Sequence, residues 1–230
     1  MTDYGLIVRN TNNQIQIDST YKNHIYKQHG SSSVNQYLNI ISINYVSTGA
    51  IFFLKTPADG TIYVSPYGFI LDSTSNVYTD IIIASSGSGT VDWIVYDQIE
   101  TTQDGNYGLN VYDSSSSLVF SSLETGYVNI INDRTVGTGY TAVRNNFKNY
   151  YAITPGLKKY AYSDCPGTGI IERYIYMFQR AGTGAEVIDI GGHVYHRETN
   201  WDCGAYSGGG GASSSSLPQH LIEIKPPPGI

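Results

Sequence analysis

Two histidines stand three residues apart in the stretch His193-Val-Tyr-His196, and an acid and a thiol follow at Asp202 and Cys203. Imidazole, thiolate and carboxylate groups are the usual ligands of zinc in proteins. In a regular β-strand, residues three apart face opposite sides, so both histidines could hold one ion only if a bulge intervened. The spacing therefore favours two separate histidines, and we expect neither a metal nor a cofactor.

A cysteine–histidine hydrolase is a second possible chemistry. A nucleophilic cysteine needs a lowered pKa, which it often obtains at a helix N-terminus beside a base. Cys165 lies in SDCPGTG and Cys203 in WDCGAY, and neither stretch leads into a helical pattern. The two thiols are also too few for a disulfide scaffold, so we expect ordinary cysteines in a protein made in a reducing cytoplasm.

Glycosidases need two carboxylates at a fixed separation, and a pair such as Asp97 and Glu100 would satisfy the residue types. Nothing in the sequence distinguishes one acidic pair from another, and no short repeat of a parallel β-helix is visible. The glycine runs GTGY and GSGT lack the lysine and the following helix of a phosphate-binding loop. We therefore expect a non-enzymatic protein and keep a polysaccharide hydrolase as an alternative.

The charges are segregated along the chain. The net charge is −6 and the pI about 5.2, which disfavours binding to nucleic acid. No lysine or arginine occurs between Thr56 and Asp133, whereas residues 134–163 contain five cations and no acid. No stretch approaches the about 20 apolar residues of a membrane-spanning helix, and the first residues do not resemble an export signal, so we expect no membrane insertion.

The basic segment is also rich in aromatic residues, and its pattern suggests a long connection more than a strand. Rigid aromatic side chains among cations suit a recognition surface for an anionic glycan or an acidic protein. An alternative reading is that half of these tyrosines lie in the core and the cations are simply solvated. The candidate contact residues are Arg144, Lys148, Tyr150, Lys158, Lys159, Tyr160 and Tyr162. The acidic region would provide a complementary surface for a head-to-tail contact between subunits.

The composition predicts an all-β protein. Only 14% of the residues are charged, and tyrosine alone contributes 21 residues. Strong helix formers are sparse, while isoleucine, valine, threonine and tyrosine, which suit a pleated and half-buried surface, are abundant. Apolar runs such as YLNIISINYV and VDWIVYDQI alternate with glycine, proline and serine at spacings of roughly ten residues, as in β-sandwiches.

One sequence pattern occurs twice in the chain. YGLIVRNTNNQIQIDS begins at Tyr4 and YGLNVYDSSSSLVFSS begins at Tyr107, an offset of 103 residues (107 − 4). Each copy reads as a hairpin with one apolar face. The offset is the size of a domain, so we predict two tandem β-sandwich domains related by internal duplication. The predicted boundaries are 1–102, 103–207 with the basic aromatic insert 134–163, and 208–230 for a Gly/Ser linker with a terminal strand.

Two segments remain open at this stage. TAVRNNFKNYY, residues 141–151, could be a short helix or an ordered loop. LPQHLIEIK follows the linker SGGGGASSSS and reads as a strand. That strand could fold back on its own domain or complete the sheet of a neighbouring subunit.

The opening hairpin resembles the N-terminal signature YGLxV…DS of small proteins encoded near the tail-fibre and tail-tip genes of tailed bacteriophages. The resemblance covers residues 4–21 and is echoed over 107–122. It implies a virion component of the tail tip, baseplate or fibre-attachment region, assembled in the host cytoplasm, and it brings no catalytic residues. The implied partners are other tail proteins and further copies of the chain. A receptor-binding protein for bacterial surface glycan and a capsid decoration protein are the alternatives.

Overall fold

The structure, a computed structural model, describes residues 7–9, 15–18, 22–57, 59–99, 108–122, 126–136, 141–144, 149–154, 159–162, 168–181, 186–202 and 219–230. These residues contain no helix, and so none that could span a membrane. The first half of the chain contributes eight strands: β1 (Ile7–Arg9), β2 (Ile15–Asp18), β3 (His24–Val34), β4 (Tyr37–Val46), β5 (Ile51–Lys55), β6 (Val64–Asp72), β7 (Val77–Ser85) and β8 (Gly89–Gln98).

The second half contributes the remaining strands, and every strand pairing in the described chain is antiparallel. The all-β prediction is confirmed. These strands are β9 (Asn110–Tyr112), β10 (Leu118–Ser121), β11 (Asn129–Val136), β12 (Thr141–Arg144), β13 (Tyr150–Thr154), β14 (Lys159–Tyr162), β15 (Thr168–Ala181), β16 (Glu186–Asp202) and β17 (Gln219–Lys225).

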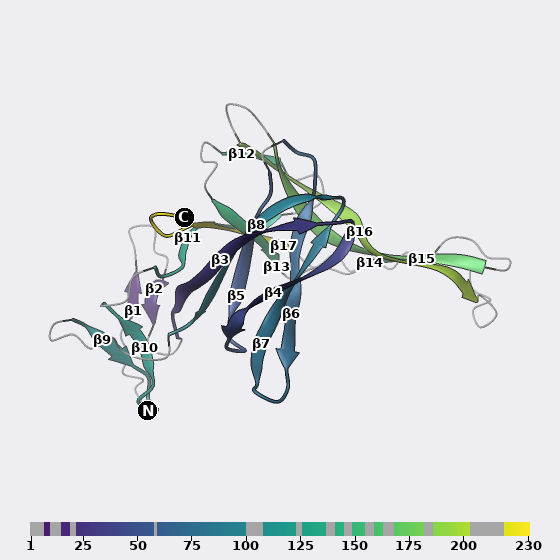
Figure 1. Cartoon of the computed structure of the whole chain (residues 1–230). Helices are drawn as coiled ribbons and strands as arrows, with labels where there is room; N and C mark the ends of the chain where they lie inside the picture. Colours follow the sequence, from purple (N-terminus) through teal and green to yellow (C-terminus); the bar gives the residue numbers. More distant parts are fainter. Residues whose placement is uncertain are drawn as a thin grey trace.

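Two large sheets form a β-sandwich-like body (Figure 1). The six-stranded sheet has the order β11-β17-β13-β5-β8-β3. The seven-stranded sheet has the order β12-β16-β15-β6-β7-β4, with β14 added alongside β15. Each large sheet therefore takes strands from both halves of the chain, and the halves meet where β5 pairs with β13 and β6 pairs with β15.

The strand pairings of the two halves correspond. If β3, β4, β5, β6, β7 and β8 are matched with β11, β12, β13, β15, β16 and β17, each sheet order reads the same from either end. The pairs β3–β8 and β5–β8 match β11–β17 and β13–β17, and the pairs β4–β7 and β6–β7 match β12–β16 and β15–β16. Only β14 has no counterpart among the described strands. Such a repeat of pairings is what a duplication would produce, and the duplication itself stays a prediction.

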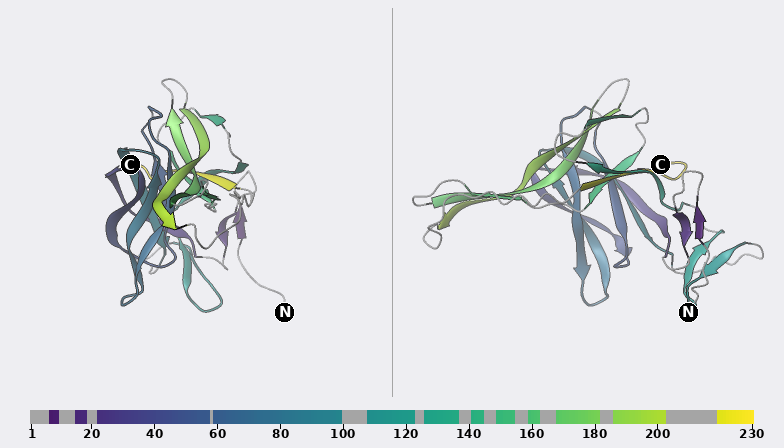
Figure 2. Two further views of the ribbon diagram at one scale, coloured as in Figure 1. Left: turned by 90° about the vertical axis from the view of Figure 1, so that its right-hand side faces the viewer. Right: turned by 180° about the vertical axis from the view of Figure 1, so that it is seen from behind.

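The two small hairpins have the same register. In the first, Val8 is opposite Ile17, and in the second Val111 is opposite Phe120, which lie 103 residues further along. Both hairpins carry a register shift at the equivalent position, next to these pairs. The predicted hairpins are thus present, and the repeated sequence encodes the same local pairing twice. Figure 2 shows both hairpins on the same side of the body.

The main core lies between the two large sheets and is shared by both halves. Leu54, Val64 and Trp93 of the first half pack in one cluster with Tyr151 and Phe178 of the second. The six-stranded sheet also carries a smaller apolar cluster on its opposite face, and this too mixes the halves: Phe53, Ile94, Tyr96, Tyr150, Ala152 and Ile224. Because both clusters cross the junction, the units 1–102 and 103–207 are packed against each other through a common core.

Two expectations change at this point. Residues 134–163 are not one long connection, since the end of β11 and all of β12, β13 and β14 lie there. Within 141–151, residues 141–144 and 150–151 are strand, and none of the described residues is helical. The strand predicted from LPQHLIEIK is β17, and it pairs with β11 and β13 of its own chain. It is an internal strand of the six-stranded sheet, in the position that β8 holds in the first half.

Candidate functional site

The sequence-predicted contact residues are spread over three strands. Arg144 ends β12, whereas Lys159, Tyr160 and Tyr162 lie in β14. Tyr150 begins β13, and Lys148 and Lys158 lie outside the described residues, as do Cys165 and Cys203. The structure therefore does not bring the whole predicted set together on one surface. Lys159, Tyr160 and Tyr162 are the members that lie on a single strand, β14.

The structure corrects the assignment of Tyr150 to an exposed contact surface. Its residue is only 4% exposed and belongs to the apolar cluster with Phe53 and Ile94. The Nζ atom of Lys55 lies 5.4 Å from the centroid of its ring. The residue is thus part of the packing at the junction and not of an exposed recognition surface. Tyr150 lies on the opposite face of the sheet from Tyr151, and the smaller apolar cluster on that face buries it.

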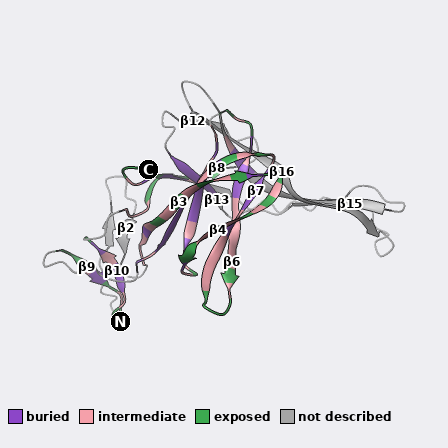
Figure 3. Cartoon of the chain, viewed as in Figure 1, coloured by how far each residue is buried: buried purple, intermediate pink, exposed green. Residues whose placement is uncertain are grey.

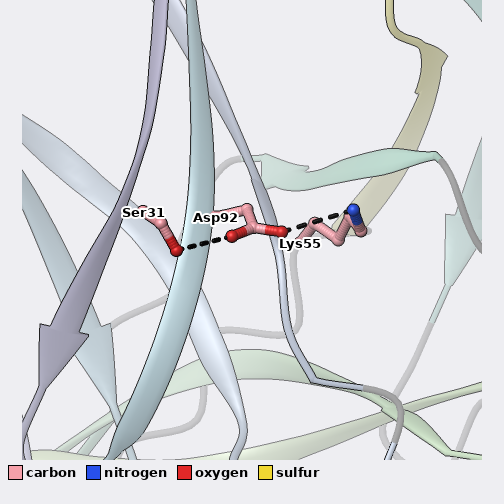
Figure 4. Close-up of polar contacts among 3 residues, drawn as sticks. All are labelled: Ser31, Lys55 and Asp92. Atoms are coloured by element: carbon pink, nitrogen blue, oxygen red, sulfur yellow. Dashed lines mark hydrogen bonds and ion pairs between the residues drawn. The ribbon is translucent and has the colours of Figure 1, made fainter. Parts of the chain in front are cut away.

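Lys55 is held by two neighbouring strands (Figure 4). Its Nζ atom lies 3.3 Å from Oδ2 of Asp92, and the Oγ atom of Ser31 donates a hydrogen bond of 2.7 Å to Oδ1 of the same carboxylate. The ammonium group is engaged by both Asp92 and the Tyr150 ring. This arrangement ties β3, β8, β5 and β13 together, and it suits a structural contact more than a reactive amine.

A projecting arm is the feature that sets the second half apart. We define the arm as β14 together with residues 168–175 of β15 and 193–202 of β16. Figures 1 and 2 show that β15 and β16 run out of the body at this end as a narrow sheet. In the first half, β6 and β7 are 9 residues each, whereas β15 and β16 are 14 and 17 residues. Within the described part of the chain, β14 pairs only with β15.

The register of the arm places tyrosines, cations and histidines in adjacent rows. One row contains Tyr160, Arg173 and His196, and another contains Tyr162, Ile171 and Glu198. The two rows are two residues apart on β14, so they share one face. The predicted residues Tyr160 and Tyr162 are thereby placed on the same face, which is the arrangement that a contact surface needs. We call this side the tyrosine face of the arm.

The two histidines of the arm also need a correction. Arg173 is opposite His196 and Ile175 is opposite His193, with a register shift between them. Since Arg173 and Ile175 are two residues apart on β15, the bulge puts both histidines on the same face of the sheet. The regular strand assumed for this spacing is thereby corrected: the bulge that the sequence argument left open is present, and the expectation of no bound metal stays a prediction. The sequence held no signal of the bulge, because bulges depend on the partner strand.

An aspartate, a serine and a histidine, the residue types of a serine hydrolase, lie near the β4–β5 turn. Their hydrogen bonds are those of a structural contact. Asp97 is 2% exposed; its Oδ2 accepts a 2.7 Å hydrogen bond from the backbone N–H of Ser47, and its Oδ1 accepts one from the Ser47 hydroxyl. The Nε2 atom of His24 lies 2.8 Å from the carbonyl oxygen of Gly49. A nucleophilic serine needs the imidazole between itself and the acid. Here the carboxylate binds the serine directly and fixes the turn. Glu100, the suggested partner of Asp97 in a glycosidase pair, lies outside the described residues.

A second buried carboxylate lies in the second half of the six-stranded sheet. Glu223 of β17 is 3% exposed, and its Oε1 accepts hydrogen bonds from Nδ2 of Asn149 at 2.7 Å and from the hydroxyl of Tyr151 at 3.3 Å. Buried polar groups of this kind are stable only when they are bonded. The arrangement ties β17 to β13 and to the residue just before it, and its role is structural.

An exposed apolar surface was missed by the sequence reasoning. On the outer side of the seven-stranded sheet, Ile40 is opposite Ile82 and Ile82 is opposite Gly68. In the next row Ser42 is opposite Asp80 and Asp80 is opposite Ile70. We call these six residues the open face. Ile40 is 64% exposed, and a Cβ atom added to Gly68 would meet nothing within 4 Å. Figure 3 shows the intermediate and exposed residues along β4, β6 and β7.

The signal for this surface is present in the sequence. In YLNIISINYV, Ile41 and Ile43 belong to one face of the strand and Ile40 to the other. Both faces of the strand therefore carry apolar residues. A strand with one solvated face normally alternates apolar and polar residues. The deviation at Ile40 marks an apolar residue on the outer side of the sheet.

Comparison with known proteins gives no further assignment. No family model, curated protein sequence or solved structure matches the chain. Within the described residues, no group of three or more histidines, cysteines and acids is placed to hold a metal ion. The candidate functional surfaces are therefore the arm and the open face.

Proposed function

We propose that the chain is a structural, non-enzymatic component of a bacteriophage tail tip, baseplate or fibre-attachment region. In this role it assembles with neighbouring tail proteins through surfaces that extend beyond its own core. The resemblance of the hairpin at residues 4–21 to phage tail-associated proteins suggests the particle, and the shape of the chain supports a role in assembly.

The single observation that carries the proposal is the arm. A narrow antiparallel sheet is marginally stable in water unless a second layer covers one of its faces. Among the described strands, no second layer covers the outer part of β15 and β16 (Figure 1). In the proposed role, a neighbouring protein that covers the arm supplies the missing layer and stabilises the folded chain through binding.

The location of the chain in the particle tests this proposal. We expect a chain labelled at its C-terminus to appear in purified virions, and cryo-electron microscopy should show density for it at the tail end with the arm against a neighbouring protein. Complete absence from virions would contradict the proposal.

A second role, binding of host-surface glycan, is favoured by the tyrosine face of the arm. Tyr160 and Tyr162 share that face with the row of Arg173 and His196. Aromatic rings stack on sugar rings, and cations attract anionic glycans. The double variant Tyr160→Ala, Tyr162→Ala separates the two roles. Loss of host adsorption by intact particles supports glycan binding, whereas failure of particle assembly supports the structural role.

The matched control is Tyr45→Ala, which removes a tyrosine that is 75% exposed on β4 of the body. This variant should assemble and adsorb like the wild type. An equal defect in Tyr45→Ala and the arm variant would show that neither phenotype is specific to the arm.

A further inference from the structure

The arm is joined to the body through a short stretch of sheet that is only two strands wide. On the body side, β15 pairs with β6 at Phe178, and β16 pairs with β12 over 186–189. On the arm side, β14 pairs with β15 over 171–174. Between these pairings, residues 175–177 of β15 and 191–193 of β16 pair only with each other in the described chain. Among the described strands, β4 approaches β16 without pairing with it. We call the residues 175–177 and 191–193 the waist, since the sheet is wider on both sides of them.

Two of the three waist residues of β16 are glycines. Gly191 is opposite Met177 and Gly192 is opposite Tyr176, and β16 contains no other glycine. A glycine inside a strand has wide backbone freedom and contributes no side chain that stiffens the sheet. The waist therefore combines a two-stranded pairing with a backbone that bends easily.

A bulge lies directly on the arm side of the waist. The register of β15 and β16 shifts between Arg173 and Tyr174, so that Tyr195 is an extra residue on β16. A bulge bends its strand and increases the local twist. Figures 1 and 2 show β15 and β16 changing direction between the body and the arm. The bulge and the two glycines thus occur together where the strands leave the body.

The body side of the waist is held by packing. Met177 and Phe178 are fully buried. The ring of Phe178 lies against Tyr151, with the ring centroids 5.6 Å apart. The Nε2 atom of Gln179 donates a 2.7 Å hydrogen bond to the hydroxyl of Tyr63. These contacts fix β15 as far as Met177, so bending is confined to the waist residues between Met177 and the arm.

A second connection between the body and the arm limits the movement. The chain passes from β13 in the body to β14 in the arm through residues 155–158. Even fully extended, a link of this length spans less than about 20 Å. The arm is therefore attached to the body at two places, which allows a swing over a restricted range and excludes free rotation.

We propose that the waist is a hinge on which the arm swings as a unit relative to the body. Hinges in proteins are a few residues, often small ones, that absorb the change in backbone angles while the parts on either side stay rigid. The use of this movement rests on the proposed function: in an assembly, a hinged arm adapts its direction to the neighbouring protein that covers it. The movement itself is a property of the single chain.

Pulsed electron spin resonance between two spin labels measures the swing in the purified full chain. In a Cys165→Ser background, one label is attached to Cys203, which directly follows β16, and the other to Thr90→Cys, an exposed position on β8. The reference pair lies within the body and combines Thr90→Cys with Leu71→Cys, at a residue 46% exposed on β6, in a chain whose native cysteines are serines. We expect the arm-to-body distribution of distances to be at least about twice as wide as the reference distribution. Equal widths overturn the hinge.

Substitution of the glycines tests whether the waist is the pivot. Gly191→Val with Gly192→Val introduces β-branched residues, which restrict the backbone and favour a regular strand, so the width of the arm-to-body distribution should fall by at least about half. Gly68→Val is the matched control, because it makes the same change on β6, where an added Cβ atom meets nothing within 4 Å, and it should leave the width unchanged.

Circular dichroism establishes that each variant is folded. If the valine variant does not fold, Gly191→Ala with Gly192→Ala takes its place, and a smaller decrease in the same direction is expected. An unchanged width in a folded double variant, or an equal decrease in Gly68→Val, overturns the waist as the pivot.

The outcome also separates this inference from the proposed function. An arm-to-body distribution as narrow as the reference overturns the hinge, and the presence of the chain in virions then still supports its assembly with other tail proteins. Absence from virions contradicts the proposed function, whereas a wide distribution in the purified chain supports the hinge in either case.

Discussion

Leu54 of β5 is the cross-strand partner of Tyr151 of β13, and this pair joins the two halves of the six-stranded sheet. Both residues are fully buried, and both belong to the main core. Phe178 and Val64 form the corresponding pair in the seven-stranded sheet. The junction therefore consists of apolar side chains that face the common interior from both halves.

A shared core predicts that the body unfolds in one step. Chemical denaturation followed by circular dichroism and by tryptophan fluorescence should give coincident transitions. Leu54→Ala should lower the free energy of unfolding by about 2–5 kcal/mol, because it leaves a cavity at the junction, and should keep the transition single. Leu71→Ala, at a residue 46% exposed, is the control with little effect. Two separate transitions in the wild type would show that the halves are independent.

The buried carboxylate of Glu223 predicts a graded response to substitution. Glu223→Ala removes the buried acceptor of the hydrogen bonds from Asn149 and Tyr151, which should cost about 1–3 kcal/mol. Glu223→Gln retains a carbonyl oxygen that can accept from Asn149, so its cost should be smaller. Thermal unfolding of the two variants measures the difference. Equal stability of both variants would show that the hydrogen bonds to Glu223 contribute little.

The sequence predicted the strand content and the hairpins for local reasons. Alternation at Leu6 and Val8 and at Leu109 and Val111 marks a face, and the residue types that follow each alternating stretch are turn formers. The pairing of Leu54 with Tyr151 could not be predicted from the sequence, because neither residue type nor spacing specifies which strands of two similar units become neighbours. Tyrosine is equally common in cores and on surfaces, which explains why Tyr150 was assigned to the wrong environment.

The two small hairpins could be predicted from local sequence, whereas the arm could not. The hairpin at Val8 and its counterpart at Val111 depend on pairings between residues that are close in sequence. Each copy of the repeated pattern contains both strands of its own hairpin. The bulge beside His196 and the addition of β14 depend on which strand lies opposite, over separations that a local pattern does not encode. The candidate residues of β14 were found from composition. Of the open face, the sequence signals only Ile40, because the other five residues are brought beside it by the pairing of β4, β6 and β7.

The close packing at Gly30 leads to a prediction about steric strain, for which Gly68 is the control. A Cβ atom at this position would lie 2.4 Å from Cζ2 of Trp93, whose Nε1 donates a hydrogen bond to the Ser32 hydroxyl. Gly30→Ala should therefore displace the indole, lower the stability by about 1–3 kcal/mol and change the tryptophan fluorescence. Gly68→Ala meets no atom within 4 Å and should be neutral or slightly stabilising. Equal effects of the two changes would contradict the close approach of β3 to Trp93.

Tyr96 predicts a stability change at high pH. The hydroxyl of this fully buried residue has no hydrogen-bond partner among the residues that the structure describes. Burial, reinforced by the nearby Tyr150 and Tyr26, raises the pKa of Tyr96 well above its usual value of 10.0. Because the folded protein holds this proton more tightly than the unfolded chain, the stability that Tyr96 contributes is present below pH 10.0 and is lost as the pH rises through the raised pKa.

Tyr96→Phe removes both the unpaired hydroxyl and its titration. At neutral pH the variant should be as stable as the wild type or more stable by up to about 1–2 kcal/mol, since a buried polar group without a partner is eliminated. Above pH 10.0 it should lose less stability than the wild type in denaturant titrations at stepwise increasing pH. Tyr26→Phe is the contrasting variant, because its hydroxyl makes a 2.6 Å hydrogen bond with Nδ1 of His29 and its loss should be slightly destabilising. A parallel decline of Tyr96→Phe and wild type with pH would show that Tyr96 does not account for the alkaline loss of stability.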